Sequence, residues 1–94
     1  MSDIDLRDDP DGHRFELLVD GEVGGLAAYR IRDGVVAITH SEVDPRFRGR
    51  GLGSELARRT LGLLRSRGAR VQVICPFFVR YVGEHHEYDD ILVG

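Results

Sequence analysis

The sequence contains no lysine and no tryptophan, and it has only one cysteine, Cys75. A single cysteine cannot form a disulfide within the chain, and four histidines beside it supply few ligands for a closed zinc site. No apolar run approaches the roughly 20 residues that a membrane-spanning helix needs, and the first residues lack the basic and apolar stretches of a signal peptide. We therefore expect a cytoplasmic protein that holds no metal and does not associate with membranes.

The charge balance is mildly acidic. Thirteen basic residues, all of them arginine, face sixteen acidic residues, which gives a net charge of −3. This balance disfavours a general nucleic-acid surface, because phosphate binding needs an excess of positive charge. An arginine-rich nucleic-acid adaptor, whose affinity would fall steeply with salt, is therefore a poor description of the chain. We expect no nucleic-acid partner.

The length and composition predict a single globular domain. Of the 94 residues, 41% are hydrophobic and 31% are charged, which is typical of a folded chain. A chain of this length is too short for two domains. Residues 1–12 contain five aspartates and one proline. We therefore predict a flexible, solvated lead-in over residues 1–12 and a folded domain over residues 13–94.

Three antiparallel strands are predicted before any long helix. Alternating apolar and polar residues indicate strands over residues 14–19, 22–32 and 35–43. The dipeptide Asp-Gly stands at both junctions and is typical of type I′ hairpin turns. The third strand begins with four apolar residues, Val35 to Ile38, so we expect it to be covered on both faces.

The second half of the chain predicts a helix, a strand and a shorter helix. Leucines at helical spacing indicate an amphipathic helix over residues 51–67, and Gly68 ends it. Residues 70–74 follow as a strand, residues 77–85 as a short helix and residues 91–93 as an end piece. Because a helix links the third and fourth strands, these two should be parallel. The expected fold class is α/β (α+β), with the order β-β-β-α-β-α and a mixed sheet.

A loop rich in glycine and arginine lies between the third strand and the long helix. Its glycines leave room for consecutive backbone N–H groups to converge on an anion such as a diphosphate, and the helix N-terminus adds its positive dipole. The chain has neither G-x-G-x-x-G nor the lysine of a P-loop, which excludes two common nucleotide motifs. A flexible helix entry whose arginines point to water is the alternative. The candidate residues are Arg48, Gly49, Arg50, Gly51, Leu52, Gly53 and Ser54.

Three segments of the chain resemble the GNAT N-acetyltransferase superfamily. The pattern Arg48-x-x-Gly51-x-Gly53 is similar to its acyl-CoA pyrophosphate loop, Gln/Arg-x-x-Gly-x-Gly/Ala. The strand end His40-Ser41-Glu42-Val43 and the segment Cys75-Pro76-Phe77 resemble those of a minimal single-domain family, and the resemblance spans residues 13–93. Ser41 stands where threonine is usual, and His86 stands where proline is common. The resemblance implies a minimal GNAT core that uses acetyl-CoA as co-substrate and no metal.

The resemblance also implies where acetyl-CoA lies and what reaction follows. The pantetheine arm would run beside Glu42 and Val43, between two parallel strands that splay apart, and the diphosphate would lie on Gly49 to Ser54. The implied function is transfer of an acetyl group from acetyl-CoA to an amine. The acceptor stays open between a protein lysine, an N-terminus and a small amine, and so does the oligomeric state. The alternative is a CoA-binding or partner-binding module that has lost transfer.

Four residues are candidates for catalysis, and each has a structural alternative. Cys75 ends a strand at the carboxyl edge, where a thiol could carry the acetyl group, or it only packs in the core. Tyr81 resembles a tyrosine that protonates the departing CoA thiolate in many GNAT enzymes, or it is a core aromatic. His40 and Glu42 share a face of a regular strand and could accept a proton from an ammonium acceptor.

A bulge in that strand would re-aim either His40 or Glu42, and a hydrogen-bonded sheet histidine is the plain reading of His40. The segment Glu84-His85-His86-Glu87 resembles a metal site only superficially. Adjacent histidines on a helix diverge by about 100°, and no further ligand pair is spaced to join them. We therefore expect no metal at this segment.

Overall fold

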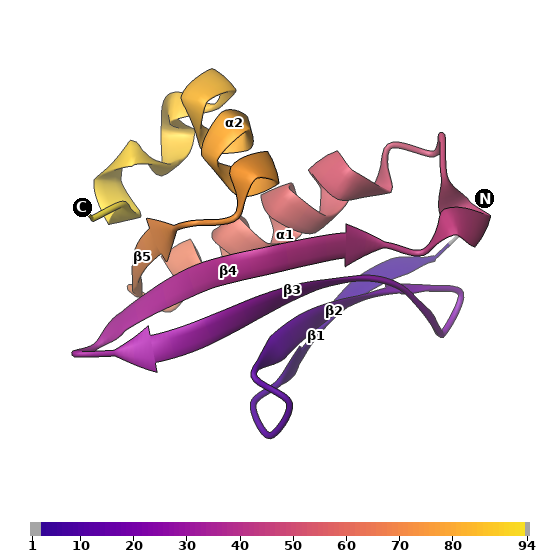
Figure 1. The fold of residues 1–94 in the computed structure, drawn as a ribbon, viewed down its shortest axis with the longest axis horizontal. Helices are drawn as coiled ribbons and strands as arrows, with labels where there is room; N and C mark the ends of the chain where they lie inside the picture. The colour runs from indigo at the N-terminus through magenta and orange to yellow at the C-terminus, as the bar shows by residue number, and fades with distance from the viewer. Residues whose placement is uncertain (1–2, 94) are drawn as a thin grey trace.

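A computed structural model describes residues 3–93 of the chain (Figure 1). Five strands form one sheet in the order β1-β2-β3-β4-β5, in which the first four are antiparallel and β4 and β5 are parallel. This arrangement confirms the expected mixed sheet and fold class. The elements are β1 (Ile4–Asp9), β2 (Arg14–Val19), β3 (Glu22–Arg32), β4 (Val35–Val43), the 3-10 turn η1 (Pro45–Phe47), α1 (Leu52–Ser66), β5 (Arg70–Val73), α2 (Pro76–Glu84) and the 3-10 turn η2 (His86–Ile91).

The two predicted hairpins are present at the expected positions. Both central residues of each turn have positive φ, with values of 51° and 84° at Asp20 and Gly21 and of 52° and 78° at Asp33 and Gly34. Positive φ at both positions defines a type I′ turn, whose twist matches that of the strands it joins. These turns set the register of β2, β3 and β4.

Residues 4–9 form strand β1, so the prediction of a flexible lead-in is wrong there. β1 pairs with β2 along its whole length, and Ile4 and Leu6 pack against the core. The Asp8 carboxylate accepts hydrogen bonds from the Tyr29 hydroxyl and from Arg67 Nη1, both at 2.9 Å. Three of the five aspartates, Asp5, Asp8 and Asp9, are part of this edge strand, where charged side chains discourage pairing with other molecules.

Both helices lie on one face of the sheet, which we call the inner face (Figure 1). The core is built there from the apolar side of α1, the buried residues of α2 and alternate residues of the strands. No helix in residues 3–93 covers the other, outer face, so the expectation that β4 is covered on both faces is wrong. Outer-face Ala37 is shielded instead by its strand neighbours Arg30 and Gln72. Neither helix is long and apolar enough to cross a membrane.

β4 and β5 separate at Ile38, which creates an opening in the sheet. Their parallel ladder ends at the pair Ile38 and Val73, and the backbone N–H groups of Ile74 and Cys75 both donate to Ile38 O, at 2.9 and 3.0 Å. β4 continues to Val43, whereas the chain after Cys75 enters α2. An extra residue in β4, Thr39, forms a bulge opposite the junction of Ala28 and Tyr29 in β3.

Candidate functional site

The N-terminus of α1 presents backbone N–H groups that no side chain of residues 3–93 caps. Gly49 and Gly51 have φ values of 82° and 71°, so the loop takes a left-handed course that favours glycine. Gly51 is the N-cap, and the first helical hydrogen bond runs from Glu55 N to Gly51 O at 3.2 Å. The N–H groups of the first turn therefore have no partner within the helix and can bind an anion.

The arginines of the loop differ in their surroundings. The guanidinium groups of Arg46 and Arg50 lie over the ring of Phe47, at 5.3 and 5.4 Å from its centroid. Arg48 is exposed and forms no ion pair with another residue between 3 and 93. Because Phe47 packs against the core, these contacts fix the path of the chain between β4 and α1.

A small cavity lies between the first turn of α1 and α2. It has a volume of about 270 Å³ and is lined by Ser54, Phe77, Arg80, Tyr81, Glu84 and His85. Space beside Gly53 is tight, because a Cβ atom there would lie 3.1 Å from Phe77 Cζ and would push the Phe77 ring aside. The side chain of Leu52 is buried in the core, so only its backbone faces the loop. The cavity thus lies between Ser54, which directly follows the glycine loop, and Tyr81.

Cys75 lies where β4 and β5 separate and serves as the N-cap residue of α2. Its side chain is 4% exposed, and its Sγ atom lies 3.1 Å from Ser41 Oγ, within hydrogen-bond distance. The sequence analysis did not assign a role to Ser41. Ser41 stands two residues before the apolar Val43, and residues two apart on a strand point to the same face. This spacing could have identified Ser41 as a residue of the inner face, on the same side as the thiol.

Tyr81 is buried in the core beside two other rings. Burial, with a further contribution from Tyr88, raises the pKa of Tyr81 to about 12. The ring of His85 stacks on that of Tyr81, with 4.0 Å between centroids and 17° between planes. The Tyr81 hydroxyl thus keeps its proton far above neutral pH and can donate it to an anion. From the sequence, either Tyr81 or His85 was expected to face inward on the short helix. The structure stacks the two rings on one another, as their helical spacing of four residues allows.

His40 and Glu42 form a pair on the outer face of β4. His40 Nε2 lies 3.2 Å from Glu42 Oε1, and their side chains are 60% and 63% exposed. The bulge at Thr39 precedes both residues, so they keep a common face. Ser41 and Val43 face the helices, and Cys75 lies in the core on that side. The structure therefore places the candidate base pair and the candidate thiol on opposite sides of β4.

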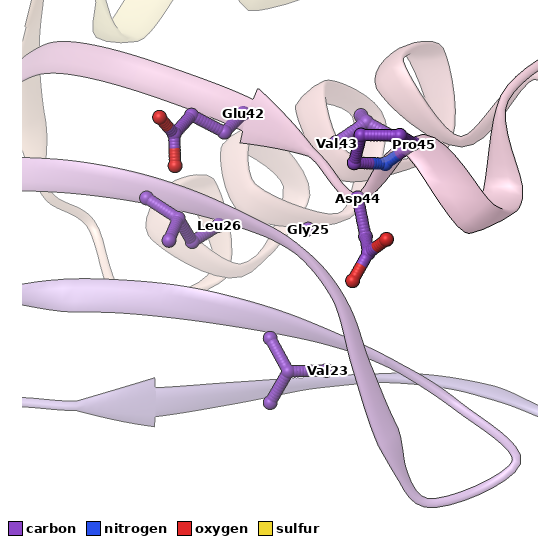
Figure 2. Close-up of a pocket in the computed structure, with 7 residues that line it drawn as sticks. All are labelled: Val23, Gly25, Leu26, Glu42, Val43, Asp44 and Pro45. Atoms are coloured by element: carbon purple, nitrogen blue, oxygen red, sulfur yellow. The ribbon is translucent and has the colours of Figure 1, made fainter.

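A cavity of about 510 Å³ adjoins Glu42 on the outer face (Figure 2). It is lined by β3 and by the end of β4, where Leu26 and Glu42 lie directly opposite one another. Hydrogen bonds from Arg46, through its backbone N–H and its side chain, lower the pKa of the neighbouring Asp44. Two carboxylates thus border a space that is open to solvent.

The described residues contain no cluster of three or more histidine, cysteine, aspartate or glutamate side chains placed to hold a metal ion. His85 stacks on Tyr81, whereas His86 Nδ1 lies 3.3 Å from Asp89 Oδ2 on η2. The two adjacent histidines therefore have separate surroundings.

Comparisons with known proteins agree with this architecture. A family model described as GCN5-related N-acetyl-transferase matches residues 14–91. The solution structure, determined by NMR, of a GCN5-like protein from Staphylococcus aureus is similar with a TM-score of 0.71 and 21% sequence identity, over 100% of this chain and 92% of that one. No curated protein sequence matches this chain.

Proposed function

Since the chain belongs to the GCN5-related N-acetyltransferase family, we propose that it transfers an acetyl group from acetyl-CoA to an amine. The observation that carries this proposal is the uncapped N-terminus of α1, framed by Gly49 and Gly51, which opens beside the cavity that contains Tyr81. The alternative is a protein that binds CoA, or a partner, without turnover.

The loop and α1 supply the groups that would bind the CoA diphosphate. The first-turn N–H groups, from Leu52 to Ser54, and the positive end of the helix dipole favour an anion at this position. Arg48 and Arg50 add two guanidinium groups, each able to bind a phosphate oxygen pair. Glu42 and Val43 lie in the part of β4 that has no partner strand on the β5 side. The pantetheine arm would lie along the backbone of these two residues.

The chemistry divides between the two faces of β4. On the outer face, His40 and Glu42 would accept a proton from the ammonium form of the acceptor. The amine nitrogen then attacks the thioester carbonyl carbon, a C–N bond forms and the C–S bond breaks. On the inner face, Tyr81 would protonate the departing thiolate. The nitrogen then loses a second proton to solvent, and solvent returns a proton to Tyr81. The net products are an amide, CoA thiol and one proton.

Cys75 offers a second route to the same products. Its thiolate would attack the thioester first, releasing CoA, and the acetyl-thioester on Cys75 would then react with the amine. Cys75 lies at the opening between β4 and β5, and the hydrogen bond with Ser41 orients the sulfur. Its burial limits this route to reagents that enter through the opening.

Mass spectrometry with and without an acceptor tests both the function and the route. With acetyl-CoA and a mixture of amines, we expect release of free CoA thiol and acetylated amine. A covalent carrier also gains one acetyl mass when no acceptor is present, and Cys75→Ser removes both the adduct and the turnover. Ser41→Ala is the matched control, because it alters the neighbour of the sulfur and leaves the thiol in place.

Three outcomes separate the alternatives. Turnover without an adduct, slowed but not abolished in Cys75→Ser, means direct attack with Cys75 lining the acetyl pocket. Binding of CoA with no thiol release from any amine means a binding module. Failure to bind CoA at all contradicts the proposed function.

A further inference from the structure

A second cavity on the outer face extends from the opening between β4 and β5 toward the β3–β4 hairpin. Its volume is about 400 Å³, which lies within the range of small-molecule sites. Val35, Ala37, Ile74 and Val93 form the apolar part of its floor, and Gln72 lies beside Ala37. Thr39 lies at one end, and Arg30 and Arg32 lie along β3. The cavity is therefore apolar at its base and cationic at one side.

Arg30 and Arg32 differ from most arginines of the chain. Seven arginines pair with carboxylates, whereas Arg30 and Arg32 form no ion pair within residues 3–93. Asp33 is the one carboxylate that lines the cavity, so its lining carries a net positive charge. Two exposed guanidinium groups above an apolar floor suit a ligand with an anionic group and a short apolar body.

The other end of the cavity reaches the candidate reaction centre. Thr39 precedes His40, and Ile74 precedes Cys75, at the point where the sheet opens. In the sheet register Arg30 lies opposite Ala37, two residues before Thr39. Two residues along a strand span about 7 Å, so an anion held by Arg30 would lie about that far from a group beside Thr39.

We propose that this cavity binds the acceptor, which therefore carries a carboxylate about 7 Å from the amine that is acetylated. This inference rests on the proposed function. Arg30 and Arg32 hold the carboxylate, the apolar floor holds the chain between the two groups, and the amine lies at the opening near His40. The carboxylate belongs either to a small amino acid or to an acidic residue beside the reactive amine of a peptide.

Three amines of equal chain length test the assignment. 6-Aminohexanoate carries the carboxylate, hexylamine lacks it, and 1,6-diaminohexane replaces it with a cation. With acetyl-CoA, we expect the kcat/KM for 6-aminohexanoate to exceed that for hexylamine by tenfold or more, and 1,6-diaminohexane to be the poorest acceptor. The blocked peptides Gly-Lys-Asp and Gly-Lys-Asn repeat the comparison for a peptide. A preference for the aspartate peptide without one for 6-aminohexanoate identifies a peptide acceptor, and the reverse identifies a small one.

Matched arginine variants locate the effect. Arg30→Gln and Arg32→Gln should each raise the KM for 6-aminohexanoate and leave that for hexylamine unchanged. Arg70→Gln is the control, because it removes the same charge from an exposed strand arginine that lies outside this cavity. The double variant Arg30→Glu with Arg32→Glu should reverse the order of the three amines.

A binding measurement separates failure of this inference from failure of the proposed function. Titration of the protein with 6-aminohexanoate, followed by NMR, should shift the backbone amides of Arg30, Arg32, Thr39 and Ile74, whereas hexylamine should leave those of Arg30 and Arg32 unshifted. If these shifts occur without any acetyl transfer, the site stands and the proposed function is wrong. If transfer occurs with equal kcat/KM for the three amines and also for the two peptides, or with no effect of the arginine variants, the acceptor assignment is wrong. Absence of both the shifts and the carboxylate preference also overturns it.

Discussion

The two faces of the sheet differ in what surrounds their reactive groups. On the inner face Cys75 and Tyr81 lie among apolar side chains beneath the helices, and burial raises the pKa of Tyr81 to about 12. On the outer face His40, Glu42 and Arg30 are exposed to solvent. Burial therefore controls the chemistry of the inner face, whereas charge controls that of the outer face.

This difference matches the needs of the proposed reaction, which has two substrates. A thioester is protected from hydrolysis where water is excluded, and a charged amine is recognised more readily on a surface that stays hydrated. β4 separates the two environments and carries residues that face each of them. A single strand can therefore serve both substrates because its side chains alternate between the faces.

The largest expected effect contrasts the packing of the two faces. Phe78, on α2, is fully buried in the core on the inner face, whereas Ile74 on the outer face is 50% exposed. Phe78→Ala should lower the free energy of unfolding by about 3–5 kcal/mol, a large part of the stability of a domain this size. Ile74→Ala should cost below about 1 kcal/mol. Urea denaturation of both variants measures the difference, and equal costs would contradict the one-sided core.

The next effect concerns catalysis on the inner face. Tyr81→Phe removes the proposed proton donor and leaves the ring stack with His85 in place. We expect kcat to fall about 100-fold, with little change in the KM for acetyl-CoA. Steady-state kinetics and a thermal melt of the variant test this together. A kcat that stays within twofold of the parent in a folded variant would leave Tyr81 with a packing role.

A smaller effect is expected at the CoA loop. Substitution of Gly51, at the start of α1, is compared with substitution of Gly68, just after the end of the same helix. Gly51 and Gly68 have φ values of 71° and 67°, and a Cβ atom would meet nothing within 4 Å at either position. Gly51→Val and Gly68→Val should therefore cost similar stability, about 1–2 kcal/mol each. Only Gly51→Val should weaken acetyl-CoA binding, by tenfold or more, because it disturbs the first-turn N–H groups. Calorimetric titration decides this, and equal affinities in the two variants would remove the loop from the site.

A separate effect, which does not involve the site, is a loss of stability at high pH that arises on the inner face. The pKa values of Tyr29 and Tyr81 are raised to about 12, mainly by burial, whereas an unfolded tyrosine titrates near pH 10. Between about pH 10 and pH 12 the unfolded chain loses these protons first, so the free energy of unfolding should fall as the pH rises. Urea titrations at pH 9 and pH 11 measure the fall. Tyr29→Phe and Tyr81→Phe should each reduce it, and an unchanged pH dependence in both would assign it to other groups.

Most of the strands and helices could be predicted from the sequence because their signals are local. Three such signals agree with the fold, and each acts within a few residues. They are the Asp-Gly turns, the alternation of apolar and polar residues in β2 to β4, and the spacing of leucines in α1. β1 was missed because its two apolar residues, Ile4 and Leu6, are too few to outweigh five aspartates in a composition argument. Its pairing with β2 depends on a surface that only the folded sheet provides.

The sequence allowed individual candidate residues of the site to be chosen, but it did not show how these residues are arranged in space. The glycine loop could be located from its residues and the resemblance. Which face His40, Ser41 and Glu42 occupy depends on the bulge at Thr39, which requires the register against β3 and has no signal in β4 alone. The contact of Ser41 with Cys75 joins residues 34 positions apart, so it too requires the fold.

The extra residue at Thr39 also marks a point at which β4 can change its length. Ile38 and Ser41 face the same side although three steps separate them, because the bulge takes up one of those steps. Deleting Thr39 would leave these two residues two steps apart in a regular strand, so Ser41 would still face the thiol. The same deletion in a strand without a bulge would exchange the faces of all residues on one side of it. The bulge thus lets β4 lose a residue without turning its side chains over.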